Sequence, residues 1–395
     1  MNNNDNTTNS PLCPQALPKG ETAEGQRGYF PARHVLLPEG YDGRTCTFYL
    51  ALEEYVAQHC PAYGADGRPE AYFFTWRLPA TVVMGRNQVA HQEVDLDFCR
   101  REHIDITRRK SGGGAVFADP DNLMLSLITP GADVETTFQT YAHAVSEALR
   151  TLGAPTTVSG RNDIVLDPLT LPDGTQIPGG KVCGNAFYHL ADRNIVHGTM
   201  LYDTNPRLMQ GALHPDVSKL RSAGVKSVRS RVALLKDYIP IGPEKLRSSL
   251  IPLLTDRCVA LTPADLAVVE ELEKEYRTDE FLYGSSATTD VTLGGRIKGV
   301  GSLMLHFDLK GSLVRNVTLS GDYFELSGRA SEAFSRAFTG CRFTPEALTA
   351  AVNAHHPERE VRNLTPEALI VLLTNDPPAN PSAFWPSSSI SSSSP

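Results

Sequence analysis

The residue types best suited to chemistry gather in one stretch, where three cations run into three consecutive glycines and then into an apolar strand: Arg108-Arg109-Lys110-Ser111-Gly112-Gly113-Gly114-Ala115-Val116-Phe117. Glycine backbones approach a ligand closely and adopt positive φ, and successive amides in such turns form concave anion sites. Guanidinium groups add planar donor forks that fit carboxylates and phosphates. The stretch predicts an anion cradle at a strand end; a surface turn with a solvated charge run is the alternative.

The spacing excludes two common phosphate-binding loops. Lys110 precedes the glycines, which a Walker A loop does not allow, and Phe117 stands where a dinucleotide fingerprint needs a third glycine. The class of ligand has to come from other parts of the chain.

A second chemical stretch begins at Gly160-Arg161-Asn162-Asp163 and returns, after a Pro/Gly-rich insertion, as Lys181-Val182-Cys183-Gly184-Asn185-Ala186. A lone lysine is usually a solvated surface residue. Lys181, however, leaves two glycines and enters an alternating strand of small residues, which leaves room for a ligand. Asn162, Asp163 and His197 supply groups that can read a purine edge or a Mg²⁺-bound phosphate. For His197 a satisfied core histidine is the alternative.

Composition excludes several classes of protein. The 395 residues are 41% hydrophobic, enough for a large core and two or three domains. No apolar run approaches the about 20 residues of a membrane span, and we expect no secretory signal at the N-terminus. The seven cysteines are scattered and never in Cys-x-x-Cys spacing, so we expect reduced thiols in the cytoplasm, without a zinc site or disulfide frame.

The net charge of −8 argues against nucleic-acid binding, yet six cations and no acid lie between positions 219 and 236: Lys219, Arg221, Lys226, Arg229, Arg231 and Lys236. A solvated face is the ordinary explanation for a charge run. As a group in an acidic chain, these cations predict a docking surface for an acidic partner or for phosphates.

Hydrophobic periodicity places these stretches on an ordered region between two ends, residues 1–28 and 375–395, that we expect to be disordered. Helices are predicted at 45–60, 94–103, 137–152, 264–276, 332–338 and 345–353. Strands are predicted at 71–77, 81–84, 104–107, 115–117, 122–128, 163–166, 181–189, 194–202 and within 291–318.

The two chemical stretches and His197-Gly198-Thr199, in this order and spacing, closely resemble the lipoate–protein ligase family of the biotin/lipoate ligase superfamily. Thr81-Val-Val-Met-Gly-Arg86 resembles the family strand before the substrate pocket, and residues 219–235 resemble a later family segment. Leu305-His-Phe-Asp-Leu and Gly321-Asp-Tyr-Phe resemble the small C-terminal accessory domain. The resemblance covers roughly residues 30–355, and four ordered motifs make chance agreement improbable.

The resemblance implies an α+β fold, with a large catalytic domain of mixed and antiparallel sheets packed with helices at residues 29–257. A small α/β accessory domain and trailing helix would occupy 261–374. It implies an ATP-dependent ligase that activates free lipoate to lipoyl-AMP and transfers the lipoyl group to a lysine of lipoyl-domain proteins. The accessory domain would pack beside the active site during activation and swing away afterwards.

The resemblance also assigns roles to residues. Lys181 would be the catalytic lysine. The lipoate-binding residues would be Val83, Arg86, Arg108, Arg109, Ser111, Gly112, Gly113, Gly114, Ala115, Val116 and Phe117. The nucleotide-binding residues would be Arg109, Gly114, Ala115, Val116, Phe117, Asn162, Asp163, Lys181 and His197, and Asp163 would also bind the Mg²⁺ of Mg-ATP. The apolar slot for the dithiolane would involve Val82, Val83, Val116 and Phe117.

The implied partners are lipoic acid and acidic lipoyl domains, namely the E2 subunits of 2-oxoacid dehydrogenases and the glycine cleavage H protein. We expect a monomer with neither nucleic acid nor membrane partners, in the cytoplasm or, in a eukaryote, in mitochondria.

Three alternatives remain open. An octanoyl or lipoyl transferase on the same scaffold would pass the acyl group through a thioester, for which Cys183, expected on the strand face of Lys181, is the candidate nucleophile. A biotin ligase fits the glycine loop less well. A non-catalytic lipoyl- or nucleotide-binding regulator is disfavoured by Lys181.

Overall fold

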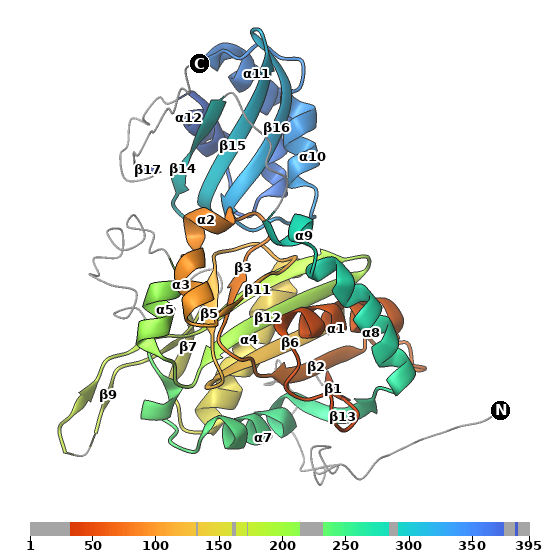
Figure 1. Cartoon of the computed structure of the whole chain (residues 1–395), viewed down its shortest axis with the longest axis vertical. Helices are drawn as coiled ribbons and strands as arrows, with labels where there is room; N and C mark the ends of the chain where they lie inside the picture. Colours follow the sequence, from red (N-terminus) through yellow and green to blue (C-terminus); the bar gives the residue numbers. More distant parts are fainter. Residues whose placement is uncertain are drawn as a thin grey trace. The chain divides into compact units, whose positions relative to one another are not determined.

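The computed structural model describes residues 32–131, 133–159, 163–171, 173–213, 232–283, 291–374 and 384–385. The chain divides into two compact units (Figure 1). Within the described residues, the first unit holds 32–83, 97–107 and 116–277, and the second holds 84–96, 108–115 and 278–385. The glycine loop therefore groups with the C-terminal residues.

An eight-stranded sheet with the order β13-β1-β2-β6-β12-β11-β8-β7 organises the first unit. β1 is parallel to β13 and to β2, and the remaining pairs are antiparallel. The strands are β1 (Ala32–Leu36), β2 (Ala71–Trp76), β6 (Asn122–Pro130), β7 (Thr156–Ser159), β8 (Asp163–Leu166), β11 (Gly180–Leu190), β12 (Arg193–Leu201) and β13 (Thr255–Ala260). Because β11 and β12 form a hairpin, the strand that carries Lys181 lies beside the strand that carries His197.

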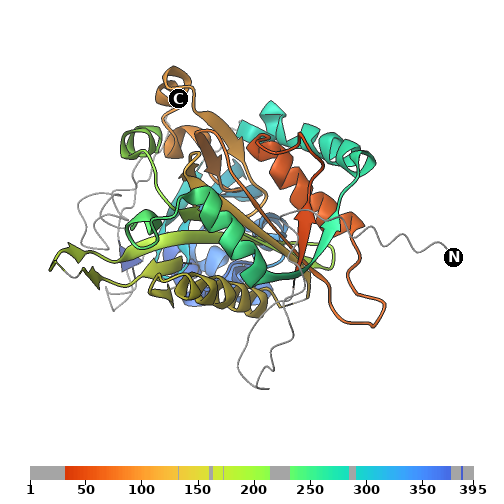
Figure 2. The same cartoon turned by 90° about the horizontal axis from the view of Figure 1, so that it is seen from below.

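Three helices of the first unit pack on this sheet, namely α1 (Cys46–His59), α4 (Val134–Thr151) and α7 (Pro243–Leu254). The unit also contains α3 (Leu96–Arg101), α5 (Pro206–Ala212), η2 (Leu235–Asp237) and α8 (Pro263–Tyr276). α1 packs on β6, β12 and α8, while α4 packs on β7, β11 and α7 (Figure 2). α1 ends before Pro61, which cannot continue its hydrogen bonding.

Helix α8 is tied to α1 by side chains. Thr45 and Thr47 donate hydrogen bonds to Glu273, at 2.8 and 2.6 Å, and Tyr55 donates to Asp265 at 2.5 Å. A capping box at Thr262 starts α8. Residues 263–276, which follow the predicted start of the accessory domain at 261, thus pack on α1.

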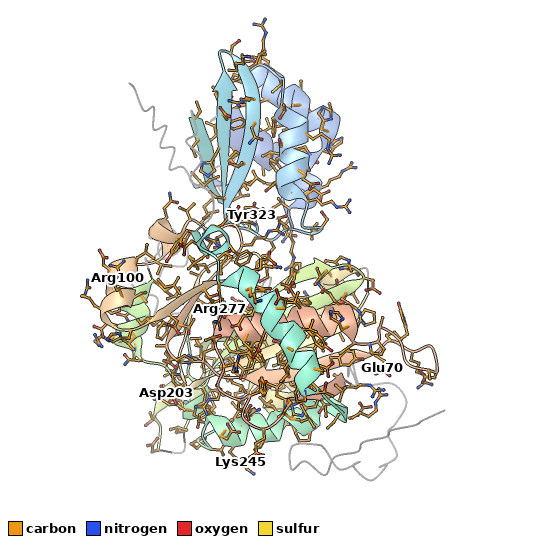
Figure 3. All side chains as sticks on the ribbon, turned by 45° about the vertical axis from the view of Figure 1, so that its right-hand side comes forward. Glu70, Arg100, Asp203, Lys245, Arg277 and Tyr323 are labelled. Atoms are coloured by element: carbon orange, nitrogen blue, oxygen red, sulfur yellow. The ribbon has the colours of Figure 1, made fainter. Side chains whose placement is uncertain are left out.

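The parallel edge of the sheet is held by a buried carboxylate. Glu70, labelled in Figure 3, accepts hydrogen bonds from Arg33 of β1 at 2.7 and 3.1 Å and from Arg257 of β13 at 3.2 Å. Arg33 and Arg257 are register partners across β1 and β13. One acid therefore neutralises two neighbouring cations.

A small sheet with the order β4-β3-β5 leads into the glycine loop. Its strands are β3 (Thr81–Met84), β4 (Asp105–Arg108) and β5 (Val116–Ala118). A two-stranded hairpin, β9 (Leu169–Thr170) with β10 (Gln176–Ile177), forms part of the Pro/Gly-rich insertion.

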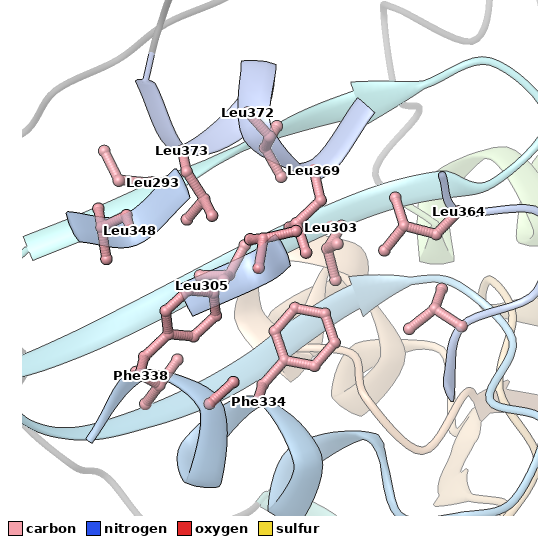
Figure 4. Close-up of a cluster of buried hydrophobic side chains, with 14 of the residues drawn as sticks. Leu293, Leu303, Leu305, Phe334, Phe338, Leu348, Leu364, Leu369, Leu372 and Leu373 are labelled. Atoms are coloured by element: carbon pink, nitrogen blue, oxygen red, sulfur yellow. The ribbon is translucent and has the colours of Figure 1, made fainter. Parts of the chain in front are cut away.

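The C-terminal part of the second unit is an antiparallel sheet, β16-β15-β14-β17, with three helices packed on one face. Its elements are α9 (Asp279–Tyr283), β14 (Val291–Ile297), β15 (Gly301–Lys310), β16 (Leu313–Asp322), α10 (Ala330–Phe338), α11 (Pro345–His355), η3 (Pro357–Glu360), α12 (Pro366–Thr374) and β17 (Phe384–Trp385), and α2 (Ala90–Glu93) also belongs to this unit. Alternate residues of β15, Leu303, Leu305 and Phe307, meet Phe334 and Phe338 of α10 in a closed apolar core (Figure 4).

These elements confirm the predicted α+β class. Of the tail from 375, the structure describes only Phe384–Trp385, which pairs with β14. Cys46, Cys60, Cys99, Cys183 and Cys341 carry free thiols, but Cys258 is disulfide-bonded, so the expectation of thiols only is wrong there. Among the described helices, none combines the length and apolar character that crossing a bilayer requires.

Candidate active site

Lys181 and Asp163 form an ion pair at the start of the β11 and β8 pairing. Nζ of Lys181 lies 2.7 Å from Oδ1 of Asp163, and each side chain is about a third exposed, 36% and 35%. The backbone of Lys181 is fixed on its other side, where Ala233 donates to its carbonyl at 2.9 Å. The ammonium group is therefore held in place yet reachable from solvent.

A bulge decides which way Lys181 points. The pairing of β11 with β8 shifts register between Lys181 and Cys183, since Lys181 opposes Val165 and Cys183 opposes Ile164. The extra residue breaks the alternation of faces. A Cβ on Gly184 would lie 2.7 Å from both Cε and Nζ of Lys181, so the lysine stem lies over Gly184.

The expectation that Cys183 shares a strand face with Lys181 is consequently wrong. Cys183 has no solvent exposure, and its thiol donates to Oδ1 of Asn185 at 3.3 Å. A Cβ on Gly198 would lie 3.0 Å from the sulfur, so Cys183 shares its face with Asn185 and Gly198. Burial raises the pKa of Cys183 to about 12, although Lys181 opposes part of this increase. Such a thiol is neutral near pH 7 and a poor nucleophile.

His197 lies on the face of the sheet that carries Gly184. The register pairs Gly184 with Thr199 and Ala186 with His197, and directly opposed residues share a face. The His197 ring is buried, and its Nδ1 lies 2.9 Å from Oε2 of Glu53 on α1. This is the contact of a satisfied core histidine, and a role for His197 in binding nucleotide stays a prediction.

In the second unit, the turn after β3 wraps the guanidinium of Arg108. Nη1 of Arg108 donates to the carbonyls of Gly85, Arg86 and Gln88 at 2.9, 2.9 and 2.7 Å, and Nε donates to the carbonyl of Leu282 at 2.9 Å. Burial lowers the pKa of Arg108 from its ordinary value. Arg108 therefore brings a cation into the loop and also shapes the turn that follows Met84.

Arg109 shapes the glycine loop in the same way. Its guanidinium donates to Ser111 Oγ at 2.9 Å and to the carbonyls of Gly112 and Gly114 at 2.7 and 2.9 Å. The loop amide of Arg86 also donates to the Ser111 carbonyl at 2.9 Å. The arginines and the glycines of the predicted cradle are thus brought together.

Two of the glycines are required by close backbone contact. A Cβ on Gly112 would lie 2.3 Å from the carbonyl oxygen of Tyr323, and Gly113, at φ +88°, donates its amide to the same oxygen at 3.0 Å. A Cβ on Gly113 would also lie 2.9 Å from the ring of Phe324. The backbone of Tyr323 and Phe324, which follows β16, therefore packs directly against this loop.

The apolar candidates for the dithiolane slot lie on two faces of the small sheet. Val82 opposes Phe117, and Val83 opposes Val116. Directly opposed residues share a face of a sheet, and consecutive residues of a strand alternate between faces. Val82 and Phe117 therefore lie on one face, and Val83 and Val116 lie on the other. Val83 and Phe117 are buried, and Val116 is half-buried.

Some predicted residues have no structural account. Asn162 and the cations at 219–231 lie outside the described residues. Lys236, the last of the basic segment, pairs with Asp203 at 2.7 Å. Among the described residues, no three His, Cys, Asp or Glu side chains gather as a metal site.

Sequence reasoning missed Glu53 and the contact of Tyr323 with the glycine loop. The signal for Glu53 was available, because Glu53-Glu54 interrupts the apolar run Tyr49-Leu-Ala-Leu of α1. Buried acids on an apolar helix need partners. For Tyr323, the sequence indicated that Gly321-Asp-Tyr-Phe is a family motif, but not that this motif contacts the glycine loop.

Comparisons with known proteins identify the family to which the chain belongs. The lipoyl protein ligase A/B catalytic domain profile matches residues 45–253, more than half of the chain, and the bacterial lipoate protein ligase C-terminus profile matches residues 286–373. Lipoate–protein ligase 1 of Staphylococcus aureus is 29% identical over 317 residues, covering 78% of this chain and 90% of the relative. The ligase LplJ of Bacillus subtilis is 29% identical over 335 residues, covering 82% and 95%.

A solved structure supports the same relationship. One chain from the structural analysis of a bi-partite lipoate protein ligase and its E2 lipoyl domain from Thermoplasma acidophilum matches with a TM-score of 0.53 and 26% identity, covering 66% of this chain and 99% of that chain. The resemblance carried by the glycine loop, Lys181 and the C-terminal motifs is confirmed. The chain belongs to the lipoate–protein ligase family of enzymes and carries both its catalytic and its C-terminal domain.

Proposed function

We propose that this enzyme uses ATP to activate free lipoate as lipoyl-AMP and then transfers the lipoyl group to a lysine of lipoyl-domain proteins. The observation that carries the proposal is that two side chains of β11, Lys181 and Cys183, lie in different environments. Lys181 lies over Gly184, partly exposed and paired with Asp163, whereas the candidate thiol, Cys183, is turned into the core with its pKa raised to about 12. Activation by ATP needs the cation, and a thioester route needs the thiol.

In the first half-reaction a lipoate carboxylate oxygen attacks the α-phosphorus of ATP. The new O–P bond forms as the bond to the β-phosphate oxygen breaks, and pyrophosphate leaves with that electron pair. Two anions must be brought together, so a fixed cation lowers the barrier by orientation and charge stabilisation. We assign this role to Lys181, since Asp163 fixes its position.

The glycine loop, within the second unit, is the part of the chain that we propose to contact lipoate and nucleotide. Arg108 would lie near the lipoyl carboxylate, with Ser111 to Phe117, Arg86 and Val83 around the acyl chain. Arg109 and residues 114–117 would contact the nucleotide. What supports this is that both guanidinium groups and three glycines occupy one loop, where the cations hold the backbone in shape.

Asp163 is a suitable single protein ligand for Mg²⁺, because that ion usually binds through one or two carboxylates plus substrate phosphates. Bound there, the ion would neutralise phosphate charge. Asn162, Asp163 and His197 complete the proposed nucleotide contacts.

For the acceptor we propose acidic lipoyl domains, namely those of E2 subunits and the glycine cleavage H protein. Support comes from the similar Thermoplasma acidophilum protein, which is described as a lipoate protein ligase together with its E2 lipoyl domain. The proposed setting is the cytoplasm, with the enzyme as a monomer, which size-exclusion chromatography with light scattering would check.

The test is mass spectrometry of a purified lipoyl domain after incubation with the enzyme, ATP, Mg²⁺ and lipoate. We expect a lipoyl adduct on its lysine that disappears without ATP. Lipoate-dependent exchange of pyrophosphate into ATP should accompany it. An adduct that forms from lipoyl-protein donors without ATP, with no exchange, would support the transferase instead.

A further inference from the structure

A cavity lies within the first unit, at the carboxyl ends of the three parallel strands. β13, β1 and β2 run side by side in one direction (Figure 1). Residues 34–38 of β1 and its following loop, 74–75 of β2 and 260–261 at the end of β13 line the cavity, together with side chains of α1 and α7. Parallel sheets commonly bind ligands at this end of their strands. Lys181 and the glycine loop are not among the described residues that line it.

The cavity has room for a small organic molecule. Its volume is about 240 Å³. An apolar cavity of about 150 Å³ holds one benzene molecule, so by proportion this cavity holds roughly ten non-hydrogen atoms. The apolar part of its wall consists of buried side chains from four separate segments: Leu36, Leu52, Phe74 and Leu261.

The cavity is reached from solvent beside the loop that joins β1 to α1. Asp42 of this loop is 79% exposed, and Pro38 is half-buried. Arg247 of α7 also lines the cavity, and its side chain is 16% exposed. A ligand can therefore enter between this loop and α7 while the strands stay paired.

The guanidinium of Arg247 is fixed at one side and has donors left at the other. Its Nε donates to Oγ1 of Thr75 at 3.0 Å, and Nη1 lies 3.3 Å from Oε1 of Glu244. Within the described part of the chain, Nη2 makes only a long ion pair with Asp42, at 3.9 Å. Glu244 and Asp42 are 61% and 79% exposed, so solvent screens both acids and they neutralise Arg247 only weakly.

Tyr49 of α1 supplies a second donor to the same cavity. Its hydroxyl oxygen accepts from the Gly43 amide at 3.2 Å, and no described group accepts its proton. Burial raises the pKa of Tyr49, so the hydroxyl stays protonated near pH 7, while the positive charge of Arg247 acts in the opposite direction. This electrostatic effect shows that the hydroxyl and the guanidinium are near each other.

We propose that this cavity is a second ligand site, which binds a monocarboxylate with an apolar chain of about eight carbon atoms. Nη2 of Arg247 and the hydroxyl of Tyr49 donate to the carboxylate, and the chain lies against Leu52, Phe74 and Leu261. An apolar pocket with a few convergent polar groups is the usual form of a small-molecule site. The inference does not rest on the proposed function, because Lys181 and the glycine loop take no part in it.

The experiment locates the ligand directly. The full-length enzyme is irradiated with an eight-carbon carboxylate that carries a diazirine in its alkyl chain, and labelled peptides are mapped by mass spectrometry. We expect label within residues 34–52, 74–75 or 260–261. Octanoate should compete for this labelling, whereas octanol, which has the chain without the charge, should compete at least tenfold more weakly.

Variants of the two donors test the recognition of the carboxylate. Arg247→Gln should reduce labelling of these peptides at least tenfold, since it removes a charged hydrogen-bond donor. Tyr49→Phe, which keeps the ring, should reduce it about two- to tenfold, as expected for one neutral donor. Lys245→Gln removes an exposed cation from the same helix, and labelling should stay within about twofold of wild type.

Circular dichroism of each variant would establish that it is folded. Label in the glycine-loop peptides would report the other site and should not change in Arg247→Gln. Label that is absent from residues 34–52, 74–75 and 260–261, equal competition by octanol, or unchanged labelling in both donor variants would each overturn the inference. The outcome does not depend on whether the enzyme forms lipoyl-AMP, so failure of the proposed function would be recognised separately.

Discussion

At the scale of single residues, the orientation of Lys181 matters more than its presence. The stem lies across Gly184 and the ammonium group pairs with Asp163. A side chain larger than hydrogen at 184 would occupy the position of Cε and Nζ. A flexible lysine is thus given one location, which reduces the entropy lost when it binds a transition state.

The first prediction is that Lys181→Ala folds normally and loses activity in both half-reactions by roughly 10²–10³-fold, as expected for removal of one preorganised charge donor. Pyrophosphate exchange and transfer from preformed lipoyl-AMP measure the two steps. Lys245→Ala, an exposed lysine of α7, is the matched control and should be neutral. Exchange within tenfold of wild type in Lys181→Ala would remove this residue from the mechanism.

The second prediction concerns Cys183. Because burial raises the pKa of its thiol to about 12, iodoacetamide at pH 8 should leave it unmodified in the folded enzyme and label it only after denaturation, as peptide mass spectrometry would show. Cys183→Ser should keep at least a third of wild-type activity, since the proposed ligase needs no thiol. A lipoyl thioester trapped on Cys183 would contradict both expectations.

At the scale of elements, the first unit depends on contacts between parts of the chain that are distant in sequence. β13 completes the sheet beside β1, and α8 covers α1. At the edge formed by β1 and β13, the carboxylate of Glu70 is 6% exposed and bridges two arginines.

The third prediction is a pH-dependent loss of stability in Glu70→Gln. The hydrogen bond from Arg33 holds the pKa of Glu70 below its ordinary value. A lowered folded-state pKa contributes stability above the unfolded-state pKa and loses it as pH falls through the folded-state pKa. Both arginines are partly exposed, 32% and 46%, so we expect a loss of about 1–2 kcal/mol at pH 7.

Urea unfolding at pH 7 and near pH 3.5 would measure this effect. The difference between Glu70→Gln and wild type should shrink at the lower pH, where the wild-type carboxylate begins to protonate. Glu271→Gln, which breaks an ion pair on α8 with 71% exposure, should change stability by less than about 0.5 kcal/mol at either pH. A constant difference across pH would assign the effect of Glu70→Gln to packing.

At the scale of the whole molecule, the two compact units do not coincide with the segments matched by the catalytic and the C-terminal profile. The first unit extends through α8 to Arg277, and the second unit includes Met84–Leu96 and Arg108–Ala115. Within the second unit, Gly113 donates to the Tyr323 carbonyl and Gly321 donates to the Asn87 carbonyl at 2.6 Å. The C-terminal residues thus help to shape the loop that carries the predicted anion cradle.

The fourth prediction is that a truncation after Arg277 loses adenylate formation and keeps most transfer from preformed lipoyl-AMP. Ending the chain there retains α8 and all of β13, whereas a cut near Val259 would divide β13 and expose α1. The glycine loop would lose the Tyr323 carbonyl as a hydrogen-bond partner. A loop that is disordered before binding loses conformational entropy when it binds a ligand, and this loss weakens the affinity.

Circular dichroism and size-exclusion chromatography would establish that this truncation is folded. Full activity with ATP would then show that the C-terminal residues are dispensable. A folded truncation that also fails with preformed lipoyl-AMP would show that these residues complete the acceptor site.

The sequence by itself determined the elements and the chemical class. Apolar periodicity predicted α1, α4 and α8 and most strands of the large sheet to within a few residues, because side-chain spacing follows local backbone geometry. Glycines next to arginines, and a lysine in a small-residue strand, indicated anion chemistry and carried the family resemblance. These features depend only on neighbours in the chain.

Only the tertiary structure decided which of these residues lie together. The bulge after Lys181 depends on pairing with β8, and it separated Lys181 from Cys183, which strict alternation had placed on one face. Glu53 meets His197 across 144 residues, and Gly112 meets Tyr323. Such contacts are set by strand register, helix packing and the requirement that buried polar groups find partners, which are properties of the assembled core rather than of any local pattern.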